Sequence, residues 1–367
     1  MILRGALAVV LVLACATLSV AQRGAKNPQT LAKEGAAALN ERRFDDALTA
    51  FTAAAAQLPN DGNVALGAGL AAFMLGRTGD AETWFVRALK LQPNLLQASI
   101  VLGELQHRSG RIDDAIATYE AALKLAPKAN AGQLEDRLAA WRKEQQLVGR
   151  FSRSQGTHFT VLFEGPADEI LARRIVDHLE SAYLHVGESL RAYPTQTITV
   201  VLSTTQQFQD ITRMPAWTVA SYDGRIHVPV RGALQQTDQL DRVLTHEFVH
   251  AVVANIGGPA VPVWLHEGLA TALEPGGVAQ SDAVLAAVSV RPRLQDLHGS
   301  FSRLNAAQAQ VAYAYSTHAV RRIMELRGAY AVVGLLRDLA RGVDFNTAFG
   351  KNAQMRYEEF DAMIRRD

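Results

Sequence analysis

The chain has 367 residues, of which 49% are hydrophobic, so it is long enough to build two separate cores. Lysine and arginine together number 37 against 36 for aspartate and glutamate, which leaves neither a basic field nor an acidic tail. We therefore expect no nucleic-acid partner.

An export signal is the first element that the sequence predicts. Arg4 precedes an apolar run from Ala6 to Ala16, and Ser19-Val20-Ala21 forms a small-residue cleavage site before Gln22. Cleavage after residue 21 leaves no cysteine, which excludes disulfides and cysteine metal sites. An uncleaved anchor and a lipoprotein attached through Cys15 are the alternatives. No later stretch has the roughly 18 apolar residues of a membrane span. We expect a periplasmic or secreted protein.

A repeat of 34 residues organises residues 22–130. Prolines, alanines, glycines and aromatic residues each recur at this spacing. The four series are Pro59, Pro93 and Pro127; Ala47, Ala81 and Ala115; Gly35, Gly69 and Gly103; and Phe51, Phe85 and Tyr119. A generic alanine-rich bundle, the competing interpretation, predicts no fixed period. The pattern resembles tetratricopeptide repeats, in which small residues let paired helices approach, an aromatic fills the gap and proline ends the second helix.

Three such repeats are expected, near residues 28–61, 62–95 and 96–129. Three is about the minimum for a stable stack, and the last repeat needs a cover over its apolar face. Leu134 to Val148 is amphipathic and strongly charged, so we expect residues 131–150 to form a capping helix and linker. The concave surfaces of repeat arrays bind other proteins, which predicts a protein partner.

From Phe151 to the end, short β-branched runs alternate with helical patterns, which predicts a second, mixed domain over residues 151–367. The expected elements are a strand at Thr157–Phe163, a helix at Ala167–Leu190, a strand at Thr197–Leu202, a turn at Tyr222–Arg225 and a strand at Ile226–Val230. Pro229 places the last strand at a sheet edge, because proline cannot join a ladder on both sides. His227 alternates with apolar neighbours and is interpreted as solvent-facing, or as lining a substrate cleft.

A metal-binding pattern lies in the helical stretch from Thr237 to Asn255. His246 and His250 are four residues apart, so both imidazoles lie on one helix face and can reach one ion. Glu247 lies beside them, where it can act on water as a general base. An ordinary helix surface with hydrogen-bonded imidazoles is the competing interpretation. Glu267 shifts the balance, because a turn at Gly257-Gly258-Pro259 lets a second helix fold back and supply a third ligand.

The pairing of His-Glu-Phe-Val-His at 246–250 with Trp-Leu-His-Glu-Gly-Leu-Ala at 264–270 resembles the peptidase MA-like gluzincins, the zinc metallopeptidases with an HExxH motif and a later glutamate. The resemblance implies one zinc ion per chain on His246, His250 and Glu267, with Glu247 as the base. It also implies that residues 223–230 form an edge strand that holds an extended substrate. The whole chain is then α+β: an all-α repeat solenoid followed by a gluzincin-like domain with a small mixed sheet.

Two positions of the family pattern need separate treatment. Thr271 stands where thermolysin has an aspartate, so the group that orients a ligand histidine must come from another position. The segment 311–316 opens a helix and resembles a family segment with a tyrosine at Tyr313, which is the candidate oxyanion donor ahead of Tyr315 and His318. His266 is interpreted as a bystander that points to another side of its helix.

The sequence thus predicts an exported zinc metallopeptidase, either an endopeptidase or aminopeptidase-like, in which the repeats recruit a partner or substrate. One alternative is a repeat-based interaction scaffold with a weakly active or inactive peptidase-like domain. Another is a zinc hydrolase that acts on a non-peptide amide.

Overall fold

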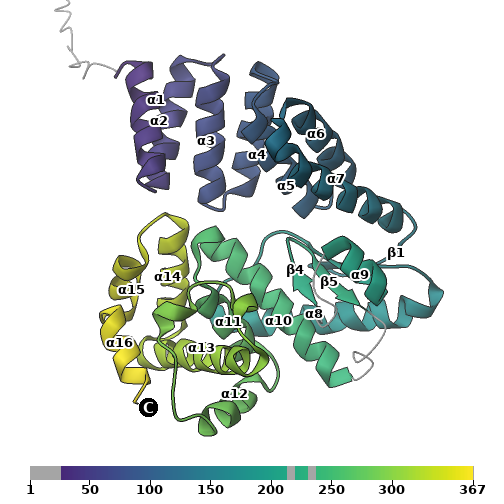
Figure 1. Cartoon of the computed structure of the whole chain (residues 1–367), viewed down its shortest axis with the longest axis vertical. Coiled ribbons are helices and arrows are strands. Elements are labelled where there is room, and N and C mark those ends of the chain that lie inside the picture. Colours follow the sequence, from purple (N-terminus) through teal and green to yellow (C-terminus); the bar gives the residue numbers. More distant parts are fainter. Residues whose placement is uncertain (1–25, 213–219, 230–236, 367) are drawn as a thin grey trace, which may run out of the picture.

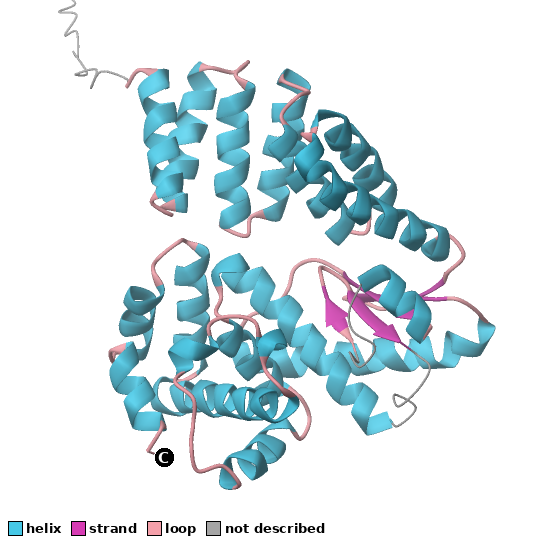
Figure 2. Cartoon of the chain, in the orientation of Figure 1, coloured by secondary structure: helices cyan, strands magenta, loops and turns pink. Residues whose placement is uncertain are grey.

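A computed structural model describes residues 26–212, 220–229 and 237–366. The predicted export signal at residues 1–21, with Cys15, lies outside the described residues. The chain forms an array of helices and, beneath it in Figure 1, a second half in which helices surround a small sheet. Helices dominate both halves (Figure 2). Within the described part of the chain, none of the helices is both long and apolar enough to cross a membrane.

The first half is a row of paired helices. They are α1 (Pro28–Asn40), α2 (Phe44–Gln57), α3 (Gly62–Met74), α4 (Thr78–Leu91), α5 (Leu96–Arg108) and α6 (Ile112–Leu125). Each member of the predicted proline series follows the second helix of a pair, as expected for a residue that cannot continue a helix. Three helical repeats are therefore present.

Within each repeat, an aromatic ring of the second helix lies against a glycine of the first. A β-carbon at Gly35 would come within 2.9 Å of Phe51, and one at Gly69 within 2.8 Å of Phe85. A β-carbon at Gly103 would overlap Tyr119 in the same way. The glycine and aromatic series of the sequence are thus the two sides of one contact, because only a hydrogen leaves room for the ring.

Helix α7 (Lys128–Val148) packs along α6 at the end of the array. Leu134, Leu138 and Trp141 are buried there against Tyr119, whose ring centroid lies 4.3 Å from that of Trp141. This contact removes the apolar face of the third repeat from water.

All five strands of the described residues form one mixed sheet. They are β1 (Ser152–Gln155), β2 (Phe159–Phe163), β3 (Ile198–Ser203), β4 (Ser221–Tyr222) and β5 (Ile226–Pro229), in the spatial order β1-β2-β3-β5-β4. The β2-β3 and β3-β5 pairs are parallel, and the two outer pairs are antiparallel. The predicted strands at Thr157–Phe163 and Thr197–Leu202 agree with β2 and β3 to within two residues at each end.

The remaining helices are α8 (Glu169–Leu190), α9 (Thr205–Thr212), α10 (Thr237–Gly257), α11 (Val263–Leu273), α12 (Gly277–Ala286), α13 (Ala306–Arg327), α14 (Ala329–Ala340), α15 (Phe345–Ala353) and α16 (Tyr357–Ile364). Short 3-10 turns lie at Pro166–Asp168, Gly258–Ala260, Leu294–Leu297 and Phe301–Arg303. One apolar core joins the sheet to α8, α10, α11 and α13–α16. It includes Phe159, Phe248 and Trp264, each fully buried.

The sheet-edge prediction for β5 holds only in part. Ile226 and His227 pair with β4 on one side and with β3 on the other, whereas Pro229 pairs, among the described residues, only with Ser203 of β3. The prediction that His227 faces solvent is wrong, since its exposed fraction is 0%. It shares a sheet face with Val201, and α9 packs against β3 and β5. Val230, the predicted end of the strand, lies outside the described residues.

The turns inside the three repeats face the second half. In each turn one residue has a positive φ angle, in the left-handed region of the backbone map. These residues, Arg42, Gly76 and Gly110, are again 34 positions apart. A β-carbon at Gly342 would overlap the Arg42 carbonyl, and one at Gly258 would lie 3.6 Å from the carbonyl of Met74. The two halves are therefore in close contact at several points along the row.

A buried ionic group joins the third repeat and α7 to the sheet. Glu144 of α7 accepts a hydrogen bond from Nε2 of His107 at 2.6 Å and pairs with the guanidinium of Arg225, just before β5. Arg225 also donates from Nη2 to the His107 carbonyl at 2.8 Å. All three side chains are at most 2% exposed. Burial would raise the pKa of Glu144, but His107 and Arg225 outweigh burial and lower this pKa.

Candidate metal centre

The two motif histidines occupy one face of α10. Their ring centroids are 4.7 Å apart and the rings are perpendicular. Leu244, Phe248 and Val252 on the opposite side of this helix are buried in the core, which fixes the direction in which the imidazoles point. The predicted helix at Thr237–Asn255 is therefore present, with two further residues at its end.

Glu267 comes from α11, which folds back against α10. Its Oε2 atom lies 3.4 Å from Nε2 of His246 and 3.5 Å from Nε2 of His250. One donor atom from each of the three residues lies within 4.8 Å of the others. Oε2 is buried and reaches no hydrogen-bond partner among the described residues. This group could hold a metal ion.

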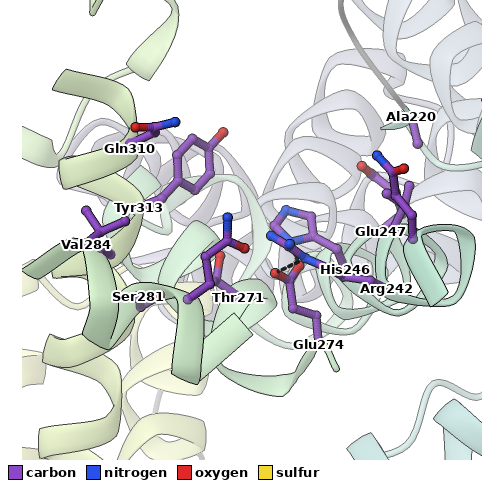
Figure 3. A pocket seen from close by; sticks show the side chains of 14 residues that line it. Ala220, Arg242, His246, Glu247, Thr271, Glu274, Ser281, Val284, Gln310 and Tyr313 are labelled. Carbon is purple, nitrogen blue, oxygen red and sulfur yellow. Dashed lines mark hydrogen bonds and ion pairs between the residues drawn. The ribbon is translucent and has the colours of Figure 1, made fainter. Parts of the chain in front are cut away.

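Gly268, the residue after Glu267, lets α13 approach closely. A β-carbon at this position would overlap the backbone carbonyl of Ser316. The approach brings Tyr313 of α13 to the same cavity as His246 and Glu247. In Figure 3, Tyr313 and Glu247 lie on opposite sides of His246. The helix begins at Ala306, earlier than the predicted opening at residue 311, because Asn305 caps it.

Tyr315 and His318, the other two candidates, lie elsewhere. Tyr315 is fully buried in the core, and burial together with the charge of Asp361 raises its pKa. His318 stacks on Tyr315 with ring centroids 6.3 Å apart. Tyr313 is the one of the three that lines the cavity. Burial also raises its pKa, so its hydroxyl keeps its proton and can donate it in a hydrogen bond.

Glu274 is the group that orients His246, and sequence reasoning missed it. Its Oε2 accepts from Nδ1 of His246 at 2.7 Å, while its Oε1 accepts from Nε of Arg242 at 2.7 Å. A carboxylate can only accept here, so Nδ1 carries a hydrogen, and Nε2 is the nitrogen that would lose its hydrogen to bind a metal ion. Glu274 follows Glu267 by seven positions, which is two helical turns and places both carboxylates on the same helix face. This spacing is the signal in the sequence from which Glu274 could have been predicted.

His266 is not a bystander. Its Nδ1 lies 3.1 Å from Nδ1 of His250, so the interpretation of His266 as a bystander is wrong. Burial and the neighbouring charge of His250 lower the pKa of His266 to about 4, which keeps it neutral near pH 7. A neutral His266 can accept the hydrogen of His250 Nδ1 and leave Nε2 of His250 free as a donor atom.

The charges of the site favour a cation between the three donors. Burial would lower the pKa of His246, but the carboxylates of Glu267 and Glu274 outweigh burial and raise this pKa to about 10. Burial would raise the pKa of Glu267, but the two imidazoles hold it well below its ordinary value. Burial raises the pKa of Glu247.

A cavity of about 410 Å³ opens beside His246. Figure 3 shows Val284, Gln310 and Tyr313 on one side of it and Arg242, Glu247 and Ala220 on the other. Thr271 lines it together with Glu274. The volume falls within the roughly 300–1,000 Å³ of ligand sites in proteins.

Comparisons with known proteins bear on the first half of the chain. The tetratricopeptide repeat family model matches residues 33–95 and 86–130. The N-terminal helical array is thus made of tetratricopeptide repeats, as the 34-residue period predicts, and such repeats suggest protein partners. The comparison with curated proteins finds no match to the chain.

Proposed function

We propose that the chain is a zinc-dependent peptidase. The observation that carries the proposal is the convergence of His246 Nε2, His250 Nε2 and Glu267 Oε2 at 3.4 and 3.5 Å. Ligand atoms about 2.0–2.1 Å from a tetrahedral zinc ion are themselves about 3.3 Å apart. The three donors fit zinc in type and spacing, and the buried Oε2 of Glu267 gains the partner it lacks among the described residues.

The surrounding residues support a site for catalysis. Three protein ligands leave a fourth position for water or substrate, which distinguishes catalytic from structural zinc sites. Glu274 and His266 fix both histidines with Nε2 toward Glu267. Histidines that bind a metal ion typically donate their other ring N–H to a group of this kind, which holds the ring in place.

A zinc ion held there would lower the pKa of water and polarise a carbonyl group. Glu247 takes a proton from the water that attacks the carbonyl carbon and delivers it to the leaving amine nitrogen. Tyr313 donates its O–H to the carbonyl oxygen as negative charge develops on it. The tetratricopeptide repeats bring in a protein partner or the substrate itself.

An interaction scaffold with a weakly active or inactive peptidase-like half is the second candidate, and the repeat match favours it. An inactive scaffold would have no need of Glu247 beside three metal donors and a cavity, so this arrangement favours the peptidase over the scaffold. A hydrolase of non-peptide amides would use the same groups. Parallel assays on peptides and on simple amides separate these candidates.

The decisive experiment compares Glu247→Gln with the wild-type protein. We expect about one zinc per chain in both by elemental analysis, and a loss of peptide hydrolysis of about 10²–10⁴-fold in the variant. Glu325→Gln is the matched control, because Glu325 lies on the half-exposed side of α13 beside Arg321 and Arg322. Full hydrolysis by Glu247→Gln would refute the assigned base.

We further propose that the protein is exported to the periplasm or secreted. The support is the sequence pattern before Gln22. N-terminal sequencing of the mature protein should start at Gln22. Incorporation of a labelled fatty acid that is lost in Cys15→Ser would instead show a lipid anchor.

A further inference from the structure

The hairpin of β4 and β5 borders the candidate metal centre. Ala220, the residue before β4, lines the cavity together with His246 and Glu247. Figure 3 shows Ala220 on the same side of the cavity as Glu247. Strand β4 also lies against α10, the helix that carries both motif histidines. The position of the hairpin therefore sets the width of the cavity beside Glu247.

The turn of this hairpin is packed against the third repeat. A β-carbon at Gly224 would overlap Cβ and Cγ of Arg108 and lie 3.0 Å from its Cα atom. Gly224 also has a φ angle of 115°, which residues with a side chain rarely adopt. The turn thus requires a glycine for its own backbone and for its close approach to the end of α5.

Polar contacts hold the turn from both sides. Arg225 donates to the His107 carbonyl at 2.8 Å and pairs with Glu144 of α7. Within the hairpin, Oδ1 of Asp223 accepts from the backbone N–H of Arg225 at 3.3 Å and lies 3.2 Å from Nε2 of His227. Burial would raise the pKa of Asp223, but His227 and His107 outweigh burial and lower this pKa. The turn is therefore tied to α5 and α7 as well as to its own strands.

We propose that the third repeat and α7 hold the β4–β5 hairpin in the place where it forms a wall of the catalytic cavity. The inference rests on the proposed function, since it takes this cavity to receive the peptide. Gly224 and Arg225 are positioning residues, because neither belongs to the metal donors or to the described lining of the cavity. They act through Ala220. The repeats are thus part of the active site as well as a surface for a partner.

The test compares two hydroxamates on Gly224→Ala and on the wild-type protein, each full-length and loaded with zinc. Acetohydroxamate is small enough to contact only the metal centre, whereas tetra-alanine hydroxamate extends along the cavity. Gly224→Ala should bind the peptide hydroxamate at least about 10-fold more weakly, because a displacement of about 1 Å can have such an effect. Its affinities for zinc and for acetohydroxamate should not change, although a general loss of folding would lower both. Equal weakening of the two hydroxamates, or no weakening, would overturn the inference.

Two further variants isolate the contact with the third repeat. Gly110→Ala is the matched control, because Gly110 has a φ angle of 81° and open space where a β-carbon would lie. It introduces similar backbone strain without a collision and should leave both affinities unchanged. Arg108→Gly, added to Gly224→Ala, removes the two side-chain atoms that the new methyl group meets and should restore part of the peptide affinity. A double variant that binds no better than Gly224→Ala would contradict the proposed contact.

Hydrogen–deuterium exchange separates this inference from the proposed function, because it requires no zinc. The amides of residues 220–222 should exchange faster in Gly224→Ala, while those of α10 keep the wild-type rate. This result, together with a wild-type protein that neither binds the hydroxamates nor cleaves peptides, would refute the peptidase and leave the hold on the hairpin in place. Peptide cleavage with unchanged exchange and unchanged hydroxamate affinities in Gly224→Ala would support the peptidase and overturn the inference.

Discussion

In the repeat half, each of three aromatic rings lies against a glycine of its own repeat, whereas in the mixed half the partners of a buried side chain come from distant parts of the chain. Phe51 meets Gly35 sixteen positions away, and Phe85 meets Gly69 at the same distance. His246, by contrast, is held by Glu274, which is 28 positions away on another helix. The repeats are built from contacts that the period encodes, and the site is built from contacts that only the packing of α10, α11 and α13 creates.

This difference predicts how far the effect of a substitution on stability spreads within each half. A repeat array is stabilised by nearest-neighbour contacts, so damage to one repeat stays partly local. The mixed half depends on one shared core. The buried group of His107, Glu144 and Arg225 couples the two and belongs to both.

The largest effect is expected for Glu144→Ala. The change leaves Arg225 buried without its partner, and an uncompensated buried charge costs about 3–5 kcal/mol. We expect the free energy of unfolding in urea to fall by this amount, with separate transitions for the two halves. Glu120→Ala is the control, because its pair with Arg142 is half-exposed and contributes about 0–1 kcal/mol. Equal losses in the two variants would show that the buried group does not join the halves.

A smaller effect, confined to the mixed half, is expected for Glu274→Ala. Loss of the acceptor for His246 Nδ1 should weaken zinc binding about 10–100-fold, as measured by competition with a chelator. Urea unfolding of the repeats should not change. Asp282→Ala removes an exposed carboxylate that pairs with Arg321 and should leave zinc binding unaltered. Unchanged zinc affinity in Glu274→Ala would contradict the role assigned to this residue.

An effect of similar size, but on stability alone, is expected for Gly103→Ala in the repeat half. The added methyl group overlaps Tyr119 and should lower the free energy of unfolding by about 1–3 kcal/mol. Gly132→Ala, inside α7 with open space around it, should instead raise it by about 0.5–1 kcal/mol. Zinc affinity should be the same in both variants. If Gly103→Ala were as stable as the wild type, the packing of the Tyr119 ring would not require a glycine at position 103.

Features that depend on spacing along one element can be predicted from the sequence. The period of 34 predicts the three helical repeats, and the four-residue spacing of His246 and His250 predicts that they share a helix face. Glu267 was placed beside them because a turn at Gly257-Gly258-Pro259 allows two helices to fold back. Those three donor groups lie together in the structure.

Features that depend on contact between separate elements could not be obtained in this way. His227 alternates with apolar residues as a surface residue would, but it is fully buried, and α9, a separate element, packs against its strand. His266 follows a helix geometry that does point it away from Glu267, yet it meets His250 of α10. The pairing of Glu144 with Arg225, 81 positions apart, left no pattern in the sequence at all.

The row of left-handed turns limits how the chain can change in length. The turn at Arg42 lies against Gly342, the turn after Met74 lies against Gly258, and Arg108 lies against Gly224. Because every repeat rests on a different segment, removing or duplicating one would shift its successors by a whole unit and separate Glu144 from Arg225. A repeat array without such contacts can gain or lose a unit freely, but here a change in the number of repeats would break the contacts with the second half.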